Sequence, residues 1–278
     1  MEAEKIGFIG LGEMGLPMAI NLQKAGNQVY AFDIDNSRCM DATRFGIVSC
    51  ASPKDCTEMA DRIVISMVRN YNQTDDIIFS NDGIVSSRKK NLCIIIMSTL
   101  DPTSMKTLEE KVAKSGNYLI DAPVSGAKSG AEAATLTIMT AGPKKLVSEC
   151  DKYFKIMGKN IFYFGSDIGC GQAAKLANNL VLAINMVACA EGMRFAQEYN
   201  ISHSNFCKLI NVSTGNSWVS QNWEAVKLWY EKYKPNQTLD IVYKDLFAIM
   251  KTCSDRHYSF PLGGLTFHLL MDAWKRTN

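Results

Sequence analysis

The chain has 278 residues, of which 47% are hydrophobic, and a formal net charge of +2. This balance predicts a soluble globular protein of one or two domains, and the lack of a basic tract argues against a dedicated nucleic-acid-binding protein. No apolar run reaches the ~18 residues that span a bilayer, so we expect no membrane-spanning segment.

The N-terminal end and the cysteines both predict a cytoplasmic protein. Met-Glu-Ala-Glu is acidic and runs directly into an apolar stretch, which leaves no room for a targeting peptide unless one has already been removed. Nine cysteines are scattered without a C-x-x-C motif, as expected for reduced thiols. The three histidines, His203, His257 and His268, have no ligand-like neighbours, so we expect no metal site.

The first predicted element is an apolar strand from Lys5, which ends in the pattern G-x-G-x-x-G. Gly10 allows a tight turn, Gly12 lets a pyrophosphate approach the backbone, and Gly15 lets the next helix pack against the strand. A plain tight turn is the alternative for such a pattern taken alone. The turn residues predicted to bind a dinucleotide are Gly10, Leu11, Gly12, Glu13, Met14 and Gly15.

A helix over residues 16–25 and a second strand over Gln28–Phe32 follow the glycines, and Asp33 ends this strand. The spacing from Gly15 to Asp33 is close to the roughly 20 residues of a dinucleotide-binding βαβ unit. A carboxylate there accepts hydrogen bonds from the adenosine ribose and repels a 2′-phosphate. The sequence therefore predicts NAD as the cofactor, with NADP as the alternative because Arg38 and Lys54 are nearby cations.

Further strands are predicted in the first half, with a helix over 103–115 between two of them. Their apolar runs indicate a largely parallel sheet covered by helices on both faces. Ligands bind at the carboxyl ends of such strands, where Met67, Val68, Thr99 and Ser125 fall. The predicted strands are Arg62–Val68, Leu92–Met97, Tyr118–Asp121, Ala134–Thr140 and Ile161–Phe164.

The second half changes character, because its apolar periodicity is helical and no strand is convincing. Residues 172–198 form a long predicted helix that is apolar almost all round, which predicts burial on all sides, between domains or in a subunit interface. We therefore expect residues 1–164 to form a Rossmann-type domain and residues 165–278 an all-α domain joined by this helix. The other predicted helices are 203–213, 217–231, 238–254 and 263–275.

Lys175 is the first candidate for acid–base chemistry. A charged side chain in a mostly apolar helix is costly unless it has a partner or a role, and burial can lower the pKa of a lysine toward neutrality. Asn179 lies one helical turn later, on the same face. A surface lysine with a capping asparagine remains the alternative explanation.

Three more positions can contact a ligand, and each has an ordinary alternative. The backbone amides around Ser125 and Gly126, with the Ser125 hydroxyl, can form a small anion pocket, or they form an ordinary turn that runs to Gly130. Thr99 and the preceding Ser98 can hydrogen-bond a substrate or nicotinamide group. Lys244 can reach a cofactor or a cleft while Asp245 pairs with another side chain, or both lie on a solvated helix face.

In combination these motifs give the chain a clear family likeness, because they occur in family order over nearly its whole length. The sequence resembles the β-hydroxyacid dehydrogenase family, which includes 3-hydroxyisobutyrate dehydrogenase and tartronate semialdehyde reductase. The matching stretches are Gly7–Asn21, Ser98–Thr99 with Pro102, Asp121–Gly126 through Met139, Gly169–Asn179, Ser213–Trp218 and Lys244–Leu246.

The resemblance implies a role for each candidate. Lys175 would be the catalytic acid/base and Asn179 its partner in the substrate site. Ser125 and Gly126 would hold the acidic group of a small substrate, a carboxylate or alternatively a sulfonate. Thr99 and Lys244 would flank the nicotinamide, and Met67 and Val68 would line the adenine and ribose side. A homodimer or homotetramer through the helical domain is also implied.

The expected activity is hydride transfer between NAD and a short 3-hydroxy acid or its semialdehyde. Imine reductases share the scaffold but usually lack a lysine at the catalytic position, and a catalytically inactive cofactor-binding interaction module is a second alternative. The chain also departs from the family pattern. Members usually carry a further glycine- and aspartate-containing segment after the last helix, whereas this chain ends at Asn278.

Overall fold

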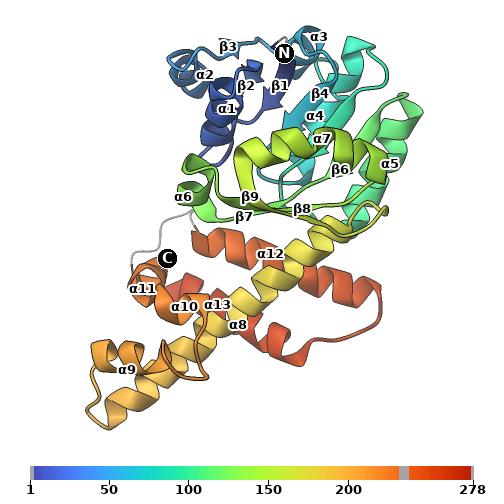
Figure 1. The fold of residues 1–278 in the computed structure, drawn as a ribbon. Helices are drawn as coiled ribbons and strands as arrows, with labels where there is room; N and C mark the ends of the chain where they lie inside the picture. The colour runs from blue at the N-terminus through green and yellow to red at the C-terminus, as the bar shows by residue number, and fades with distance from the viewer. Residues whose placement is uncertain (1–2, 232–237, 277–278) are drawn as a thin grey trace. The chain divides into compact units, whose positions relative to one another are not determined.

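The computed structural model describes residues 3–231 and 238–276 (Figure 1). These residues fall into two compact units, and the boundary between them lies inside a long helix, between Lys175 and Leu176.

The main sheet of the first unit has six parallel strands in the order β3-β2-β1-β4-β5-β6. Strand order reverses between β1 and β4, which is where doubly wound folds bind ligands at the carboxyl edge. The strands are β1 (Lys5–Ile9), β2 (Gln28–Phe32), β3 (Val48–Ser49), β4 (Ile63–Ser66), β5 (Cys93–Ile96) and β6 (Tyr118–Asp121).

Helices cover both faces of this sheet, as the continuous apolar strands predict. In β4, Ile63 and Ile65 pack on one face, while Val64 packs on the other. The first face is covered by α1 (Gly15–Lys24), α2 (Asn36–Thr43) and α7 (Lys144–Met157). The second face is covered by α3 (Pro53–Met59), α4 (Tyr71–Phe79), the short η1 (Ile84–Ser87) and α5 (Pro102–Lys114).

The later strands do not extend the main sheet as the sequence suggested. β7 (Val124–Ser125), β8 (Leu136–Thr140) and β9 (Gly158–Tyr163) form a separate three-stranded sheet, in which β7 is antiparallel to β8. Pro123 follows β6 closely and cannot donate a ladder hydrogen bond, so pairing stops there. An antiparallel bridge between Asp121 and Ala141 connects the two sheets at this point.

The described part of the second unit consists of helices, as predicted. The predicted helix 217–231 is divided at Asn222, whose side-chain amide donates to the Trp218 carbonyl (2.8 Å). The helices are α8 (Cys170–Glu198), which begins in the first unit, α9 (His203–Ile210), α10 (Trp218–Gln221), α11 (Trp223–Glu231), α12 (Thr238–Asp255) and α13 (Pro261–Arg276).

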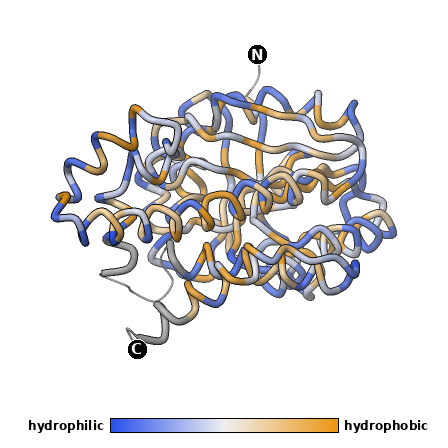
Figure 2. Tube along the Cα trace, turned by 90° about the horizontal axis from the view of Figure 1, so that it is seen from below, coloured by the Kyte–Doolittle hydropathy of each residue, from blue (hydrophilic) through white to orange (hydrophobic). Residues whose placement is uncertain are grey.

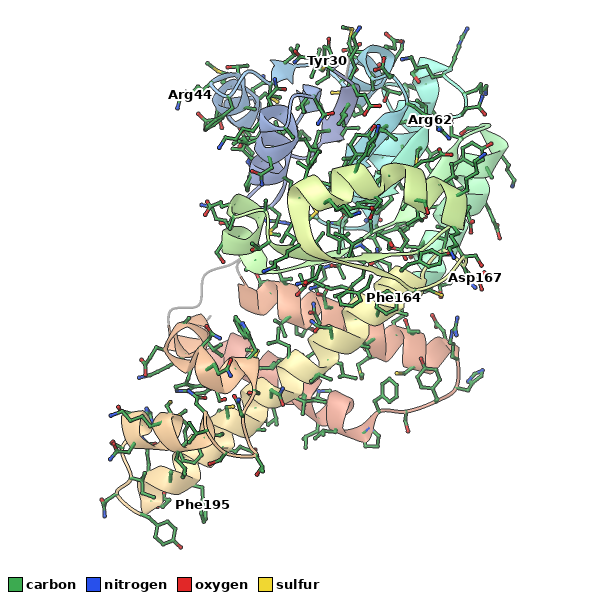
Figure 3. All side chains as sticks on the ribbon, viewed as in Figure 1. Tyr30, Arg44, Arg62, Phe164, Asp167 and Phe195 are labelled. Carbon is green, nitrogen blue, oxygen red and sulfur yellow. The ribbon has the colours of Figure 1, made fainter. Side chains whose placement is uncertain are left out.

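Within the single chain α8 is buried on only part of its surface, so its packing between domains or in a subunit interface stays a prediction. Ala183 and Met186 are fully buried, but Val181 and Phe195 are 58% and 68% exposed. Figure 3 labels Phe195, whose ring projects from the end of the ribbon of this helix. In Figure 2 the long helices alternate between apolar and hydrophilic positions, as expected for helices with one buried face.

By length and composition alone, α8 qualifies as a candidate membrane span. Long core helices of proteins without a membrane meet the same criteria, and the buried Ala183 and Met186 belong to the hydrophobic core of the second unit. The apolar character of α8 is therefore weak support for a membrane location.

Candidate active site

The glycine pattern forms the turn between β1 and α1 at the carboxyl edge of the main sheet. A Cβ on Gly10, which has φ of +97°, would lie 2.4 Å from the Met67 carbonyl oxygen, and one on Gly15 would lie 1.9 Å from the Gly10 oxygen. Both positions therefore require glycine for close packing. A Cβ on Gly12 would meet only the Arg38 Nη1, at 3.6 Å, so the space over this residue is open.

The N-terminus of α1 differs from those of its neighbours. The helices α2, α3, α4 and α5 each begin with a side chain that accepts a backbone N–H hydrogen bond, from Asp35, Ser52, Asn70 and Asp101. Met14 precedes α1 and offers no such acceptor. Open space above Gly12 and helix amides without a side-chain cap fit a pyrophosphate group. The residues of this turn therefore suit a dinucleotide.

Asp33 ends β2 beside this turn and is 6% exposed. Its Oδ2 accepts a hydrogen bond from the Leu11 N–H (2.7 Å), and its Oδ1 accepts one from the Asp35 N–H (2.9 Å). Oδ1 has a second lone pair that can still accept a ribose hydroxyl, whereas Oδ2 also accepts a long hydrogen bond from the Arg38 Nη1. The Arg38 guanidinium, about half exposed, lies 3.5 Å from Oδ2.

The remaining predicted cofactor contacts of the first unit lie on adjacent loops of the same edge. Met67 and Val68 follow β4 and are half-buried, and Thr99 follows β5. Ser98 is almost fully buried, and its hydroxyl accepts a hydrogen bond from the Val68 N–H (3.0 Å). The Ser98 hydroxyl therefore holds two loops together, while Thr99 is the more accessible of the pair.

Ser125 and Gly126 lie at the end of β7, where Ser125 pairs with Thr137 of β8. Ser125 is half-buried and Gly126 is exposed. The expected turn is shorter than predicted, because α6 (Ala127–Glu132) begins directly after Gly126. The anion pocket at this position stays a prediction.

Lys175 and Asn179 lie one turn apart on α8, as the sequence predicts. Lys175 is 8% exposed and Asn179 is 5% exposed. Holding an ammonium group in a buried position costs free energy unless other groups stabilise it, which is why such lysines are often functional. Burial of both side chains argues against the surface-lysine explanation.

Asp245 was not predicted as a site residue, although a pairing role for its carboxylate was expected as one alternative. Its carboxylate on α12 is 1% exposed and accepts a hydrogen bond from the Asn179 Nδ2 (2.6 Å). The Lys244 ammonium lies 2.9 Å from the other carboxylate oxygen. The Asn179 Oδ1 accepts from the Asn178 amide (3.1 Å), so the orientation of the Asn179 side chain is fixed.

We expect the substitution Asp245→Ala to lower the free energy of unfolding by about 1–3 kcal/mol, because it leaves the buried Asn179 amide without its acceptor. Asp255→Ala, at the exposed end of α12, is the matched control and is expected to change it by less than about 0.5 kcal/mol. Urea denaturation of both variants measures the difference. Equal stability losses would contradict the inferred role of Asp245.

Comparison with known families agrees with this geometry. Residues 5–165 match the family described as the NAD binding domain of 6-phosphogluconate dehydrogenase. Residues 169–277 match the NAD-binding domain of NADP-dependent 3-hydroxyisobutyrate dehydrogenase. The chain belongs to the β-hydroxyacid dehydrogenase family. The predicted family, the Rossmann-type fold with its helical C-terminal region, and the NAD(P)-binding domain are thereby confirmed.

Characterised members of this family are similar to the chain over most of its length. Mitochondrial 3-hydroxyisobutyrate dehydrogenase from Homo sapiens is 36% identical over 221 residues, or 80% of this chain, and the match spans 65% of that enzyme's own length. The NAD-dependent L-serine dehydrogenase of Pseudomonas aeruginosa is 32% identical, over 96% of this chain and 91% of that enzyme.

Solved structures of this family have the same fold. The 3-hydroxyisobutyrate dehydrogenase of Mycobacterium tuberculosis, solved with L-serine, superposes with a TM-score of 0.87 at 28% identity, covering 97% of this chain and 93% of that one. An imine reductase from Streptomyces aurantiacus superposes with a TM-score of 0.70 at 15% identity, covering 96% of this chain and 93% of that one. At that identity the likeness shows the fold alone.

Proposed function

We propose that this protein is an NAD-dependent dehydrogenase that acts on a short 3-hydroxy acid, or on its semialdehyde in the reverse direction. The observation that carries the proposal is the buried Lys175, one helical turn from the buried Asn179 on α8. Relatives with 3-hydroxyisobutyrate and L-serine as named substrates support the class of substrate.

Lys175 is the general acid/base in this proposal. When bound, the nicotinamide cofactor supplies the acceptor or donor of hydride at the carbon that carries the oxygen. In oxidation, the neutral Lys175 Nζ accepts the proton of the substrate hydroxyl. In reduction, the Lys175 ammonium returns a proton to the oxygen of the forming alkoxide.

Asn179 has a positioning and substrate-binding role beside Lys175. Its Nδ2 is committed to Asp245 and its Oδ1 accepts from Asn178, so its amide has a fixed direction. A fixed amide on the same helix face as the lysine can hold a substrate oxygen without a further cost in side-chain entropy.

Ser125 and Gly126 are proposed to bind the acidic group of the substrate. The Ser125 hydroxyl and the exposed backbone at Gly126 can donate hydrogen bonds to a small anion, and the residues around them are small. A carboxylate is the expected group, with a sulfonate as the alternative. Thr99 and Lys244 are proposed to flank the nicotinamide, and Met67 and Val68 the adenine and ribose.

We propose NAD rather than NADP because Asp33 is fixed at the end of β2 by its hydrogen bonds from Leu11 and Asp35. Asp33→Asn removes the charge that repels a 2′-phosphate and leaves Arg38 beside the ribose position. We expect the ratio of kcat/KM with NADP to kcat/KM with NAD to rise about tenfold, or ~1.4 kcal/mol. Steady-state kinetics with both cofactors measures this ratio.

The control for the cofactor prediction is Asp41→Asn, which removes a charge of the same sign from the exposed surface of α2, where Asp41 pairs with Arg44. This variant is expected to leave the cofactor ratio unchanged. A wild-type protein that already prefers NADP would show that Arg38 outweighs the Asp33 carboxylate.

The domain roles and the assembly are part of the same proposal. We propose residues 1–164 as the NAD-binding domain and residues 165–278 as the domain for substrate binding and oligomerisation. Exposed apolar side chains on the second unit, among them Val181, Phe195 and Val212, support a homodimer or homotetramer through these helices. Light scattering after size exclusion tests this, and cell fractionation tests the proposed cytoplasmic location.

Two rival functions remain, an imine reductase and an inactive interaction module that binds the cofactor. The buried Lys175 supports the dehydrogenase against the first, and the fixed Asn179 side chain one turn from Lys175 supports it against the second. NADH consumption with a C3–C4 semialdehyde and with a cyclic imine separates all three. Turnover of the imine alone would support the imine reductase, and NADH binding without any turnover would support the module.

A further inference from the structure

A buried carboxylate caps the start of α8 from a distant strand. Asp121, at the end of β6, is fully buried, and its Oδ2 accepts hydrogen bonds from the Gly169 N–H (3.1 Å) and the Gln172 N–H (3.0 Å). The first N–H groups of a helix need such acceptors, and a negative charge near them is favoured by the helix dipole. Asp121 therefore acts as a capping group for the helix that carries Lys175.

The side chain of Gln172 joins this cap to a third segment. Its Nε2 donates to the Asp121 Oδ1 (2.9 Å) and to the Ser98 carbonyl (2.9 Å), while its Oε1 accepts from the Leu100 N–H (2.8 Å). Gln172 is fully buried, so each of these bonds replaces water that the side chain has lost. The amide holds the loop on either side of Thr99.

Close packing leaves no room for α8 to shift toward β6 and β8. A Cβ on Gly171 would lie 2.3 Å from the Met139 carbonyl oxygen and 3.0 Å from the Asp121 Oδ2. Burial raises the pKa of Asp121 to about 7. Hydrogen bonds from the N–H groups of Gln172, Gly169 and Gly171 act in the opposite direction and lower this pKa. Loss of one of these donors thus leaves a buried carboxylate poorly stabilised.

The hydrogen bonds continue across the carboxyl edge of the main sheet. The Ser98 hydroxyl accepts from the Val68 N–H after β4, and the Ser98 carbonyl accepts from Gln172. A continuous and mostly buried path of hydrogen bonds therefore links Val68, the loop with Thr99, Asp121 and the first turn of α8. Its two ends carry residues proposed for the cofactor and for proton transfer.

We propose that Asp121 and Gln172 are positioning residues, which hold Lys175 in register with Thr99 across the carboxyl edge of the sheet. Gln172 precedes Lys175 by about one turn of α8, and its amide bonds to both neighbours of Thr99. The inference rests on the proposed function, because it assigns Lys175 the proton transfer.

The test is Gln172→Met, which keeps the length of the side chain and removes its hydrogen bonds. Displacing a catalytic group by 1 Å can reduce turnover ~10²-fold. The shift of Lys175 in Gln172→Met is expected to be smaller, so we expect kcat to fall about tenfold. The Kd for NADH, measured by fluorescence, is expected to stay within about threefold, because the glycine turn and Asp33 are unchanged.

Asn117→Ala is the matched control for loss of stability. Asn117 is a buried amide in the same unit, before β6, where its Oδ1 accepts from the Leu92 N–H (3.0 Å). Both variants are expected to lower Tm by at least about 2–4 °C. Well below Tm, only Gln172→Met is expected to lose turnover.

Two results would overturn the proposal: wild-type kcat in Gln172→Met, or the same loss of kcat in Asn117→Ala. If Gln172→Met does not fold, Gln172→Asn replaces it, because the shorter amide stays polar but cannot reach Asp121 and Leu100 together. An unchanged kcat in that variant would equally contradict the positioning role. If Lys175→Ala keeps its activity, the proposed function fails instead, so the two failures are distinguishable.

Discussion

Lys175→Ala is expected to lower turnover by ~10²–10⁴-fold while NADH still binds, because general acid–base catalysis contributes a factor of that size. The Lys175 side chain is buried on α8, with 8% of its surface exposed. We propose the glycine turn of β1 and α1 as the main cofactor contact, so NADH binding is expected to survive. Single-turnover kinetics together with NADH fluorescence titration measures the two effects separately.

Lys175→Arg separates proton transfer from charge. Arginine keeps the positive charge but does not release its proton near neutral pH, so a general acid/base role predicts that this variant is about as slow as the alanine variant. Near-normal turnover in Lys175→Arg would mean that the lysine only stabilises a negative charge. Near-normal turnover in Lys175→Ala would remove the residue from the mechanism altogether.

Gly12→Ala is expected to weaken NADH binding on the order of 100-fold, or ~2.7 kcal/mol, without destabilising the fold. The added Cβ enters open space and meets only the Arg38 Nη1 at 3.6 Å. The same space is where the pyrophosphate is expected to approach the backbone. Isothermal titration with NADH and a thermal melt of the free protein measure both parts of the prediction.

Gly15→Ala is the informative contrast at the same turn. Its Cβ would lie 1.9 Å from the Gly10 carbonyl oxygen, so the variant is expected to be destabilised before any cofactor is added. If Gly12→Ala bound NADH as tightly as the wild type, the pyrophosphate would have to lie elsewhere. If both variants lost the same stability, the space over Gly12 would not be open in solution.

The sequence predicted the first unit well where local patterns decide the structure. The strands that become β1, β2, β4, β5 and β6 are apolar runs, and each is buried against helices on both sides of one sheet. The two-residue strands β3 and β7 carry no such pattern. The separate second sheet depends on where pairing stops after Asp121, and hydrophobic periodicity does not encode this.

The candidate site was predictable in part for the same reason. Lys175 and Asn179 are close in sequence, so helical spacing alone places them on one face. The sequence did not predict Asp245 and Gln172 as site residues, because their contacts join distant segments: Asn179 with Asp245, and Gln172 with both Ser98 and Asp121. The signal available in the sequence was a polar residue, aspartate or glutamine, within an otherwise apolar stretch.

The most direct test of the central claim is the rate of NADH formation by the wild-type protein with a panel of C3–C4 3-hydroxy acids and their sulfonate analogues, run with NAD and with NADP. We expect turnover of at least one small 3-hydroxy acid, higher kcat/KM with NAD, and loss of that turnover in Lys175→Ala. NADH binding without turnover of any member of the panel, or of the corresponding semialdehydes in the reverse direction, would contradict it.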